Sequence, residues 1–375
     1  MIQEMIQEMN DQSIIEPIIE RLNRVFEDIS GLSGQSMRIM EVCGTHTRAI
    51  AKSGIRYLLP QEILLLSGPG CPVCVTPEYY IDIMISIADR EDVILVTFGD
   101  MMKVQGTCFS LSDKKAQGAQ ITVVYSPEDA LNIAAHHRDK LVVFVAVGFE
   151  TTAPLIGVTV KQAKAGGLDN LFFLTALKRM EPVIRFILQD ERNKINAMIC
   201  PGHVASITGA EHFRFITEEF GIPAVVCGFE SQDIAAGICR LLEQLTGKRD
   251  KKFVNLYQRC VTPNGNPIAQ QMINEVFDIA DGEWRGIGTI RNSALVLNDQ
   301  YRYLDAVKRF EIKNEQYSSP LNCLCSEILL GLKLPKECRL FGSICTPEHP
   351  SGPCMVSSEG ACAAHFKFGG DGKNG

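Results

Sequence analysis

The chain has 375 residues, of which 46% are hydrophobic and 22% are charged, and its 37 basic and 44 acidic side chains give a net charge of −7. These values are typical of a globular protein of two or three domains and exclude a disordered or fibrous chain. Because nucleic-acid-binding domains carry an excess of Lys and Arg, we expect no nucleic-acid partner. The unusual feature is the content of 14 cysteines.

The first ten residues, MIQEMIQEMN, lack the basic start and the apolar stretch of a signal peptide. The longest apolar stretches, such as residues 141–149, are about half the ~20 residues that span a bilayer. We therefore expect a cytoplasmic protein without a membrane partner. In a reducing cytosol, many cysteines indicate metal ligation or thiol chemistry rather than structural disulfides.

In chain order, the spacing of apolar residues over 14–29 predicts an amphipathic helix that closes an N-terminal segment, 1–29. Beyond it, short apolar runs end in glycine-bearing loops that lead into helical stretches. We predict strands at residues 37–42, 63–66, 93–98, 141–147, 197–200 and 224–227. Strands that alternate with helices indicate parallel α/β units, which bind ligands beyond the carboxyl ends of their strands.

The predicted fold class is α/β, with two parallel-sheet α/β domains that face a cleft. The first domain covers residues 30–137 and the second covers 138–254, with the boundary in the polar segment that ends at Lys140. Residues 255–375 form a separate, cysteine-rich C-terminal region that we interpret as an iron–sulfur domain.

Six cysteines lie close together near the end of the chain: Cys323, Cys325, Cys338, Cys345, Cys354 and Cys362. Four thiolates hold an iron–sulfur cluster or a tetrahedral zinc, and the surplus of two suggests a thiol pair beside a four-cysteine site. The alternatives are a zinc site with spare buried thiols and simple burial. Zinc ribbons usually contain paired C-x2-C knuckles, and this region has none, which favours iron–sulfur.

Two further cysteine motifs follow predicted strands directly. Cys71-Pro-Val-Cys74 opens a helix, whose N-terminus stabilises a thiolate, so the motif suits redox exchange or metal capture. Cys43 precedes His46 by three residues, and the pair can supply a thiolate and an imidazole to one metal. A capped turn with a surface histidine explains the second motif equally well.

Glu150 and Thr151 follow the strand at 141–147, and His203 follows the strand at 197–200. Each one alone is typical of a helix start, but loops from both α/β units converge if the units share one cleft. The remaining cysteines lack partners at ligand spacing, and we interpret them as buried: Cys108, Cys200, Cys227, Cys239 and Cys260.

The chain contains several long and unusual words in order from about residue 30 to the end: EVCGTHT (41–47), SGPGCPVCVTP (67–77), TFGDMMKV (97–104), GFETTAP (148–154), PGHV (201–204) and ECRLFGSICTPEHPSGPCMVSSEGACAAH (337–365). Together they resemble the HypD family of hydrogenase maturation proteins. Two positions depart from the family words: Ala205 stands where a serine is expected, and residues 103–105 read Lys-Val-Gln where the family has arginine and proline.

The resemblance implies a scaffold that binds iron and assembles the Fe(CN)2CO fragment of [NiFe] hydrogenase, rather than a conventional turnover enzyme. Its implied partners are the small chaperone HypC and the cyanide donor HypE, with HypF upstream and the hydrogenase large subunit served indirectly. Outside these complexes we expect a monomer. The alternatives are a stand-alone iron–sulfur thiol/disulfide oxidoreductase and a zinc-stabilised interaction module.

The resemblance also implies roles for individual residues. Cys43 ligates the iron of the nascent unit, and Cys71 and Cys74 form an essential thiol pair beside it. The same cleft is lined by His46, Glu150, Thr151 and His203. By similarity to ferredoxin:thioredoxin reductase, the implied [4Fe-4S] ligands are Cys323, Cys338, Cys345 and Cys354. The implied redox pair is Cys325 and Cys362. From the surplus of cysteines we expect this pair to relay electrons toward Cys71 and Cys74.

Overall fold

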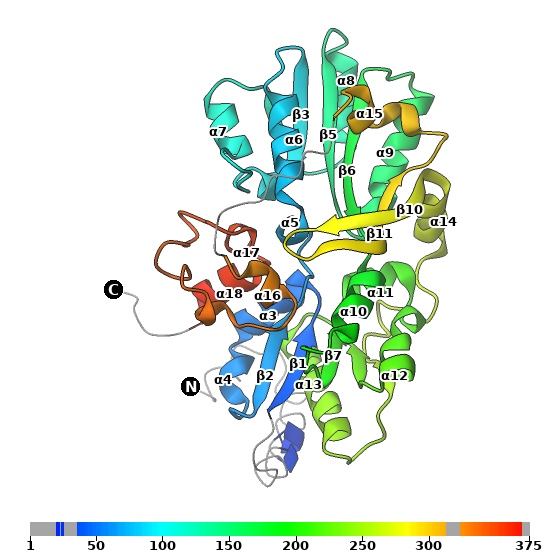
Figure 1. Ribbon diagram of the computed structural model, residues 1–375. Coiled ribbons are helices and arrows are strands. Elements are labelled where there is room, and N and C mark those ends of the chain that lie inside the picture. The colour runs from blue at the N-terminus through cyan, green and yellow to red at the C-terminus, as the bar shows by residue number, and fades with distance from the viewer. Residues whose placement is uncertain (1–19, 23, 26–35, 313–322, 370–375) are drawn as a thin grey trace.

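The computed structural model describes residues 20–22, 24–25, 36–312 and 323–369. Most of the predicted N-terminal segment 1–29 lies outside these residues, and its described residues 20–22 and 24–25 are helical. Two β-sheets lie one above the other in the view of Figure 1, with the C-terminal segment at their side. No described helix has the length and apolar character that a membrane span requires.

The lower sheet in Figure 1, sheet A, has five parallel strands in the order β2-β1-β7-β8-β9. Its strands are β1 (Met37–Glu41), β2 (Ile63–Ser67), β7 (Ala197–Cys200), β8 (Ala224–Val226) and β9 (Phe253–Asn255). The upper sheet, sheet B, has six strands in the order β10-β11-β6-β5-β3-β4. These are β3 (Val93–Phe98), β4 (Ile121–Val124), β5 (Leu141–Gly148), β6 (Leu171–Lys178), β10 (Phe277–Trp284) and β11 (Gly288–Leu297).

Sheet B is mostly parallel, because β6, β5, β3 and β4 run in one direction. The antiparallel pairs are β11 with β6 and β10 with β11. The prediction of an α/β protein with two mainly parallel sheets is therefore confirmed. All six predicted strands are present within one residue at each end. Strands β4, β6, β9, β10 and β11 were not predicted from the sequence.

Helices connect the strands along the chain. They are α3 (Gly44–Ser53), α4 (Ile55–Leu58), α5 (Pro72–Val75), α6 (Glu78–Ala88), α7 (Leu111–Ala116), α8 (Asp129–His136), α9 (Ala153–Ala165), α10 (Met180–Gln189), α11 (Gly202–Thr208), α12 (Phe215–Phe220), α13 (Ser231–Leu245), α14 (Pro267–Val276), α15 (Ala306–Arg309), α16 (Cys325–Leu329), α17 (Pro353–Val356) and α18 (Ala361–Phe368). Short 3-10 turns lie at Gly99–Met101, Glu211–Phe213, Arg302–Leu304 and Pro335–Glu337.

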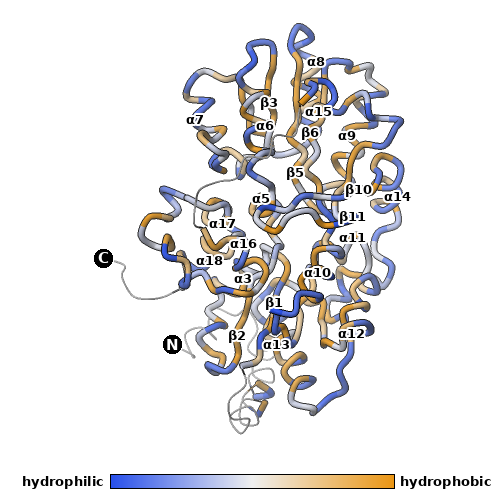
Figure 2. The backbone as a smooth tube through the Cα atoms, viewed as in Figure 1, coloured by the Kyte–Doolittle hydropathy of each residue, from blue (hydrophilic) through white to orange (hydrophobic). Residues whose placement is uncertain are grey.

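The central strands are buried on both faces, which explains why they form continuous apolar runs in the sequence. In β3, Val93 and Leu95 pack into the core that contains α6, whereas Ile94 and Val96 pack on the opposite face against α8 and α9. Successive side chains of a strand point to opposite faces, so both faces require apolar residues. Figure 2 shows the sheets mainly in hydrophobic colours and the loops beyond sheet B in hydrophilic ones.

The strand order departs from the predicted domain boundary at 137/138. The chain leaves sheet A after β2, builds β3 to β6 in sheet B, returns to sheet A beside β1, and finally adds β10 and β11 to sheet B. Residues 255–297 thus belong partly to sheet B and not to a separate C-terminal domain. Consecutive βα units look alike in sequence, and only the pairing of β1 with both β2 and β7 decides which sheet a strand joins.

The described C-terminal segment, residues 323–369, contains short helices and turns and a single isolated bridge between Phe341 and Cys345. It packs beside sheet A, with α18 against α3 and α17 against α5. We call this segment the tail. Its cysteines lie in the same apolar core as the inner face of sheet A, so the tail is attached to the domain by buried contacts.

Candidate functional site

Cys43 lies where β1 ends and α3 begins, and it occupies the N-cap position of that helix. Its backbone N–H donates a hydrogen bond of 3.2 Å to Oε2 of Glu41, and Thr47 Oγ1 donates to the other oxygen at 2.5 Å. Glu41 is 1% exposed, and burial raises the pKa of its carboxyl to about 7. This carboxyl therefore fixes the turn that presents Cys43.

The Cys43 thiol is also buried, and burial raises its pKa to about 12, although the backbone N–H groups of His46 and Thr45 oppose that rise. The thiol therefore keeps its proton near neutral pH unless a metal ion replaces it. Metal binding to a cysteine releases the proton and uses the thiolate. A buried thiol at a strand end is thus suited to hold a soft metal rather than to attack a dissolved substrate.

The C-x-x-C loop lies directly against the Cys43 turn. The N–H of Gly44 donates to the carbonyl of Gly70 at 3.1 Å, and a Cβ on Gly70 would lie 2.4 Å from the Cys43 nitrogen. Cys71 caps α5, where its Sγ accepts from the Cys74 N–H, and the two cysteines form a disulfide with their Cα atoms 5.3 Å apart. Three of the predicted site cysteines are therefore neighbours.

The two predicted histidines lie on one phenyl ring. His46 stacks on Phe229 with a centroid distance of 4.4 Å, and His203 stacks on the same ring at 4.0 Å. Nε2 of His46 lies 3.0 Å from the carbonyl oxygen of Gly228, while its Nδ1 has no hydrogen-bond partner among the described residues. Burial lowers the pKa of His46 to about 4, so the ring is neutral at pH 7.

Glu150 is not brought to this cluster. It lines a different cavity, between sheet B and helices α11 and α14, and the cavity is lined by no cysteine. Oε1 of Glu150 accepts from the Met180 N–H at 2.8 Å, and burial raises the pKa of the carboxyl to about 7. Thr151 follows it and is half-buried. No contact in the described structure joins Glu150 to Cys43 or His46.

The tail cysteines fall into two groups. Cys325 and Cys354 form a disulfide. The other four are free cysteines, and all of them line one small cavity with Cys354: Cys323, Cys338, Cys345 and Cys362. Burial raises the pKa of the Cys362 thiol, and its proximity to the other three thiols adds to the rise.

This arrangement differs from the predicted pairing. The structure pairs Cys325 with Cys354 and places Cys362 with the free thiols. The resemblance implied a pair of Cys325 with Cys362 and Cys354 among the ligands. Sequence spacing alone does not distinguish the two assignments, because the positions of Cys354 and Cys362 depend on how α17 and α18 pack.

The donor set fits an iron–sulfur cluster by its chemistry. Four buried thiols around one cavity are the ligands that such clusters take. As they stand, no three or more His, Cys, Asp or Glu side chains of the described segments are close enough together to hold a metal ion. That finding concerns a single ion, whereas each thiolate of a four-iron cluster binds a different iron, so the shared cavity lining is the relevant observation.

Glu359 is a residue of the site that was not predicted from the sequence. Thr45 Oγ1 donates to Oε1 of Glu359 at 2.8 Å, and a Cβ on Gly44 would lie 2.6 Å from the Glu359 Cβ. Its negative charge acts on both the Cys43 thiol and His203. The signal was available, since Glu359 belongs to one of the family words, but no sequence spacing connects it to residue 43.

The tail also touches the C-x-x-C loop. Sγ of Cys74 lies 3.7 Å from the carbonyl oxygen of Pro353, the residue before Cys354, and α17 packs against α5. The two disulfides therefore lie on adjacent short helices. Cys227, interpreted from sequence as merely buried, lies with its Sγ 3.7 Å from Nε2 of His46. Of the other cysteines interpreted as buried, Cys200 and Cys239 are buried, but Cys108 and Cys260 are exposed, so that interpretation was wrong for these two.

The fold and site define an α/β protein that collects buried thiols at the strand ends of one sheet and in the tail beside it. The family profile described as "HypD: Hydrogenase formation hypA family" matches residues 14–369. The chain therefore belongs to the HypD family, and the resemblance found in the sequence is confirmed.

Several curated relatives cover nearly the whole chain. Hydrogenase maturation factor HypD of Escherichia coli is 41% identical over 352 residues, 94% of each chain. The protein of the same name from Cupriavidus necator is 40% identical over 344 residues, 90% of each chain. That of Rhizobium leguminosarum bv. viciae is 41% identical over 372 residues, which are 97% of this chain and 95% of that protein.

Proposed function

We propose that this protein is a hydrogenase maturation factor: a scaffold on which the Fe(CN)2CO fragment of [NiFe] hydrogenase is assembled. The iron is the cargo, Cys43 is its ligand, and the chaperone HypC shares it. Cyanide arrives from HypE, which is supplied by HypF. The names of the relatives support the maturation role, and the geometry around Cys43 supports the assignment of the residues.

The observation that carries the proposal is the convergence of two other segments, the C-x-x-C loop and the tail, on the turn from Glu41 to Thr45 that presents Cys43. Glu41 fixes its backbone, Gly70 packs against it, and Glu359 of the tail reaches the next turn through Thr45. Thiolate is a soft ligand that suits low-spin iron. Donors such as backbone N–H groups at the start of α3 stabilise negative charge on ligands of that iron.

We further propose that a [4Fe-4S] cluster is held by Cys323, Cys338, Cys345 and Cys362. When bound, such a cluster supplies single electrons. This chain's part in the redox chemistry is the two cysteine pairs, Cys71–Cys74 and Cys325–Cys354. Each disulfide takes up two electrons and two protons and becomes two thiols, and the contact of Cys74 with Pro353 makes the pairs neighbours.

The alternative function, a stand-alone thiol/disulfide oxidoreductase, is less consistent with the burial of the C-x-x-C pair. Cys71 is 3% exposed and Cys74 is not exposed at all. A thiol that attacks a disulfide in another protein must be accessible to it. We therefore favour a pair that works inside this protein, beside Cys43.

The test is an infrared spectrum of the chain purified anaerobically with the chaperone. We expect bands of iron-bound cyanide and carbon monoxide, and we expect Cys43→Ser to remove them. Cys108→Ser is the control, because Cys108 is an exposed free cysteine outside the site. Bands of unchanged strength in the Cys43→Ser complex would contradict the assignment of Cys43 as the iron ligand.

A further inference from the structure

The cavity that contains Glu150 is large enough for a small molecule. Its volume is about 230 Å³, and its walls come from the ends of β5 and β6, from β10 and β11, and from helices α11 and α14. Figure 1 shows α11 and α14 on the side of the two sheets away from the tail. A single buried water needs only about 10–15 Å³. The cavity is therefore far larger than a site for one bridging water.

Glu150 brings an unused hydrogen-bond acceptor to this cavity. The residue is only 5% exposed, and its Oε1 accepts from the Met180 N–H at 2.8 Å. Its Oε2 is buried and has no hydrogen-bond partner among the described residues. An unsatisfied buried acceptor costs about 1–3 kcal/mol, so such groups usually have a partner. Because Glu150 lines the cavity, that partner is a donor held in the cavity.

Gln270 and Arg179 line the same cavity and add a second acceptor and a donor. Nε2 of Gln270 donates to the carbonyls of Ile207 and Asn264, both at 2.7 Å. These bonds use both amide hydrogens, so the remaining polar group of Gln270 is the acceptor Oε1. Nη1 of Arg179 donates to the Asn292 carbonyl at 2.8 Å, and its guanidinium has further N–H donors.

The remaining wall of the cavity is largely apolar. Its apolar side chains are Ile207, Ile273, Phe277, Ile279 and Leu295. Ile279 is 55% exposed although it lines the cavity, so the cavity is open to solvent on this side. A few polar groups that converge within a mostly apolar wall are typical of small-molecule sites. The lining therefore suits a ligand with an apolar body and one polar end.

We propose that this cavity binds a small molecule that ends in a primary carboxamide. The two N–H groups of such an amide match the acceptors of Glu150 and Gln270, and its carbonyl oxygen matches the donors of Arg179. The apolar body of the ligand lies against the aliphatic and aromatic wall. The site is independent of the proposed iron and cluster sites, because no cysteine lines the cavity.

The charges of the lining disfavour ionised ligands of the same shape. A carboxylate in place of the amide is repelled by Glu150, and a cation is repelled by Arg179. His212 also lines the cavity, and burial lowers the pKa of its ring, so the ring adds no charge above neutral pH. A neutral amide satisfies both acceptors and the donor without placing a like charge beside either ionised side chain.

The experiment compares three probes that share one phenyl ring: benzamide, benzoate and the benzamidinium cation. Ligand-observed NMR with the full chain measures the Kd of each one at about pH 8. At this pH Glu150 is ionised, because burial raises its pKa only to about 7. We expect benzamide to bind about tenfold more tightly than either charged probe.

Glu150→Gln tests the role of the unused acceptor. One oxygen must still accept from the Met180 N–H, so the new amide nitrogen takes the place of Oε2 and offers a donor there. We expect the affinity for benzamide to fall about tenfold and that for benzoate to rise, because its repulsion is removed. Glu243→Gln is the matched control: Glu243 is also a buried glutamate, does not line this cavity, and its replacement leaves both affinities unchanged.

Tight binding of benzamide to the wild type, with the preference reversed in Glu150→Gln, supports the carboxamide site. A wild-type chain that prefers benzoate or the benzamidinium cation overturns the ligand class. Failure of all three probes to bind, or unchanged binding of benzamide to Glu150→Gln, overturns the site. If Glu150→Gln does not fold, Arg179→Gln decides: a gain in affinity for the benzamidinium cation supports the inference, and an unchanged affinity refutes it.

Discussion

The two cysteine regions are built in different ways. The strand-end cysteines Cys43, Cys71 and Cys74 lie in loops whose ends are fixed by β1 and β2 of a parallel sheet. The tail cysteines lie on short helices and turns with one isolated bridge, and their contacts are buried side chains and a disulfide. The strand-end geometry therefore belongs to the sheet, while the tail depends on cross-links.

This difference indicates which of the two regions needs its bound metal group to keep its structure. A sheet holds its strand-end loops through backbone hydrogen bonds that exist without any ligand. A segment with little regular structure gains stability from each cross-link, because a cross-link restricts the unfolded chain. We therefore expect the tail to lose structure with its cluster, and the Cys43 turn to keep its structure without iron.

The largest expected effect tests the tail side of this comparison. Cys362→Ser removes a proposed ligand and reduces the iron content from about four per chain to near zero. Cys354→Ser breaks the disulfide with Cys325 and keeps the cluster iron, because Cys354 is a disulfide partner and not a free thiol. Iron analysis and the visible spectrum of anaerobically purified protein measure both.

The reverse result is informative. Loss of iron in Cys354→Ser, with iron retained in Cys362→Ser, would restore the ligand set that was expected from sequence. Cys260→Ser, at an exposed free cysteine, is the control and keeps all of the iron.

The second prediction tests the strand-end side. Gly70→Ala places a methyl group 2.4 Å from the Cys43 nitrogen, where only backbone atoms can give way. Overpacking of this kind costs about 1–3 kcal/mol, and we expect the upper end of that range together with loss of iron from Cys43. Urea unfolding measures the free energy, and the infrared bands measure the iron.

Gly99→Ala is the steric control for that variant, because its added Cβ meets only Val123 at 3.6 Å. We expect its free energy of unfolding to change by less than about 1 kcal/mol. Equal destabilisation by the two alanines would show that the packing of Gly70 on Cys43 has no special importance.

The third prediction concerns the pH dependence of stability and Glu150, which lies at a strand end of sheet B. Burial raises the pKa of Glu150 from 4.5 to about 7, so between these values the folded chain holds a proton that the unfolded chain has released. The free energy of unfolding therefore falls as pH rises through this window, by up to about 3 kcal/mol. Glu150→Gln removes that part of the dependence.

Urea unfolding at about pH 5 and about pH 8 measures the difference between the wild type and Glu150→Gln. Glu62→Gln, at an exposed side chain, is the control and leaves the dependence as it is in the wild type. A stability that changes by the same amount between the two pH values in the wild type and in the Glu150→Gln variant would contradict the raised pKa.

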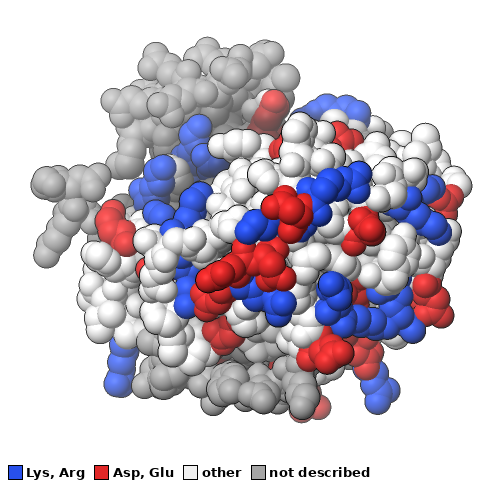
Figure 3. All heavy atoms as spheres, turned by 90° about the horizontal axis from the view of Figure 1, so that it is seen from above, with Lys and Arg blue, Asp and Glu red and all other residues white. Residues whose placement is uncertain are grey.

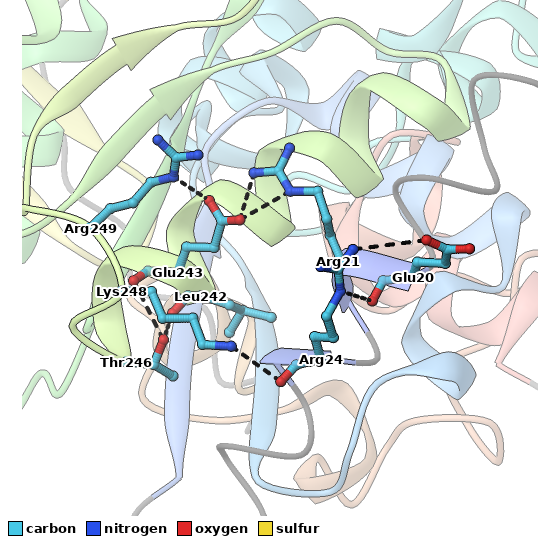
Figure 4. Close-up of polar contacts among 8 residues, drawn as sticks. All are labelled: Glu20, Arg21, Arg24, Leu242, Glu243, Thr246, Lys248 and Arg249. Atoms are coloured by element: carbon cyan, nitrogen blue, oxygen red, sulfur yellow. Dashed lines mark hydrogen bonds and ion pairs between the residues drawn. The ribbon is translucent and has the colours of Figure 1, made fainter.

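The smallest expected effect lies outside both cysteine regions. Figure 4 shows Arg21 and Arg249 donating hydrogen bonds to the two carboxylate oxygens of Glu243, whose side chain is only 10% exposed. Because Arg249 remains as a partner, Arg21→Ala costs only about 1 kcal/mol in the free energy of unfolding. Arg24→Ala, whose pair with Glu20 is exposed, changes it by about zero.

Charged pairs of this exposed type occur over much of the surface. The face seen from above in Figure 3 carries Lys and Arg interspersed with Asp and Glu. A loss in Arg21→Ala as large as that in Gly70→Ala would contradict the distinction between surface pairs and the packed Cys43 turn.

Much of the fold was predictable because buried parallel strands form apolar runs that end in glycine. β1, β3 and β7 were found in this way. The order of the strands was not predictable, since β7 pairs with β1 across more than a hundred intervening residues. The residues of neither strand identify the strand with which it pairs.

The site shows the same division. The strand-end motifs identified Cys43, His46 and His203, and the structure brings the two histidines onto Phe229. Glu150 carries the same signal, a polar residue after a strand, yet it lies in another cavity because its strand belongs to sheet B. Glu359 carries no such signal and reaches Thr45 only through the packing of the tail.

The sequence by itself determined the α/β class, the family, and which thiols are available, because apolar periodicity and residue chemistry are local properties. Only the tertiary structure decided how the thiols are grouped: Cys71 with Cys74 beside Cys43, and Cys325 with Cys354 apart from the four free cysteines. The physical reason is that grouping depends on side-chain positions a few ångströms apart, which are set by strand order and helix packing and not by spacing along the chain.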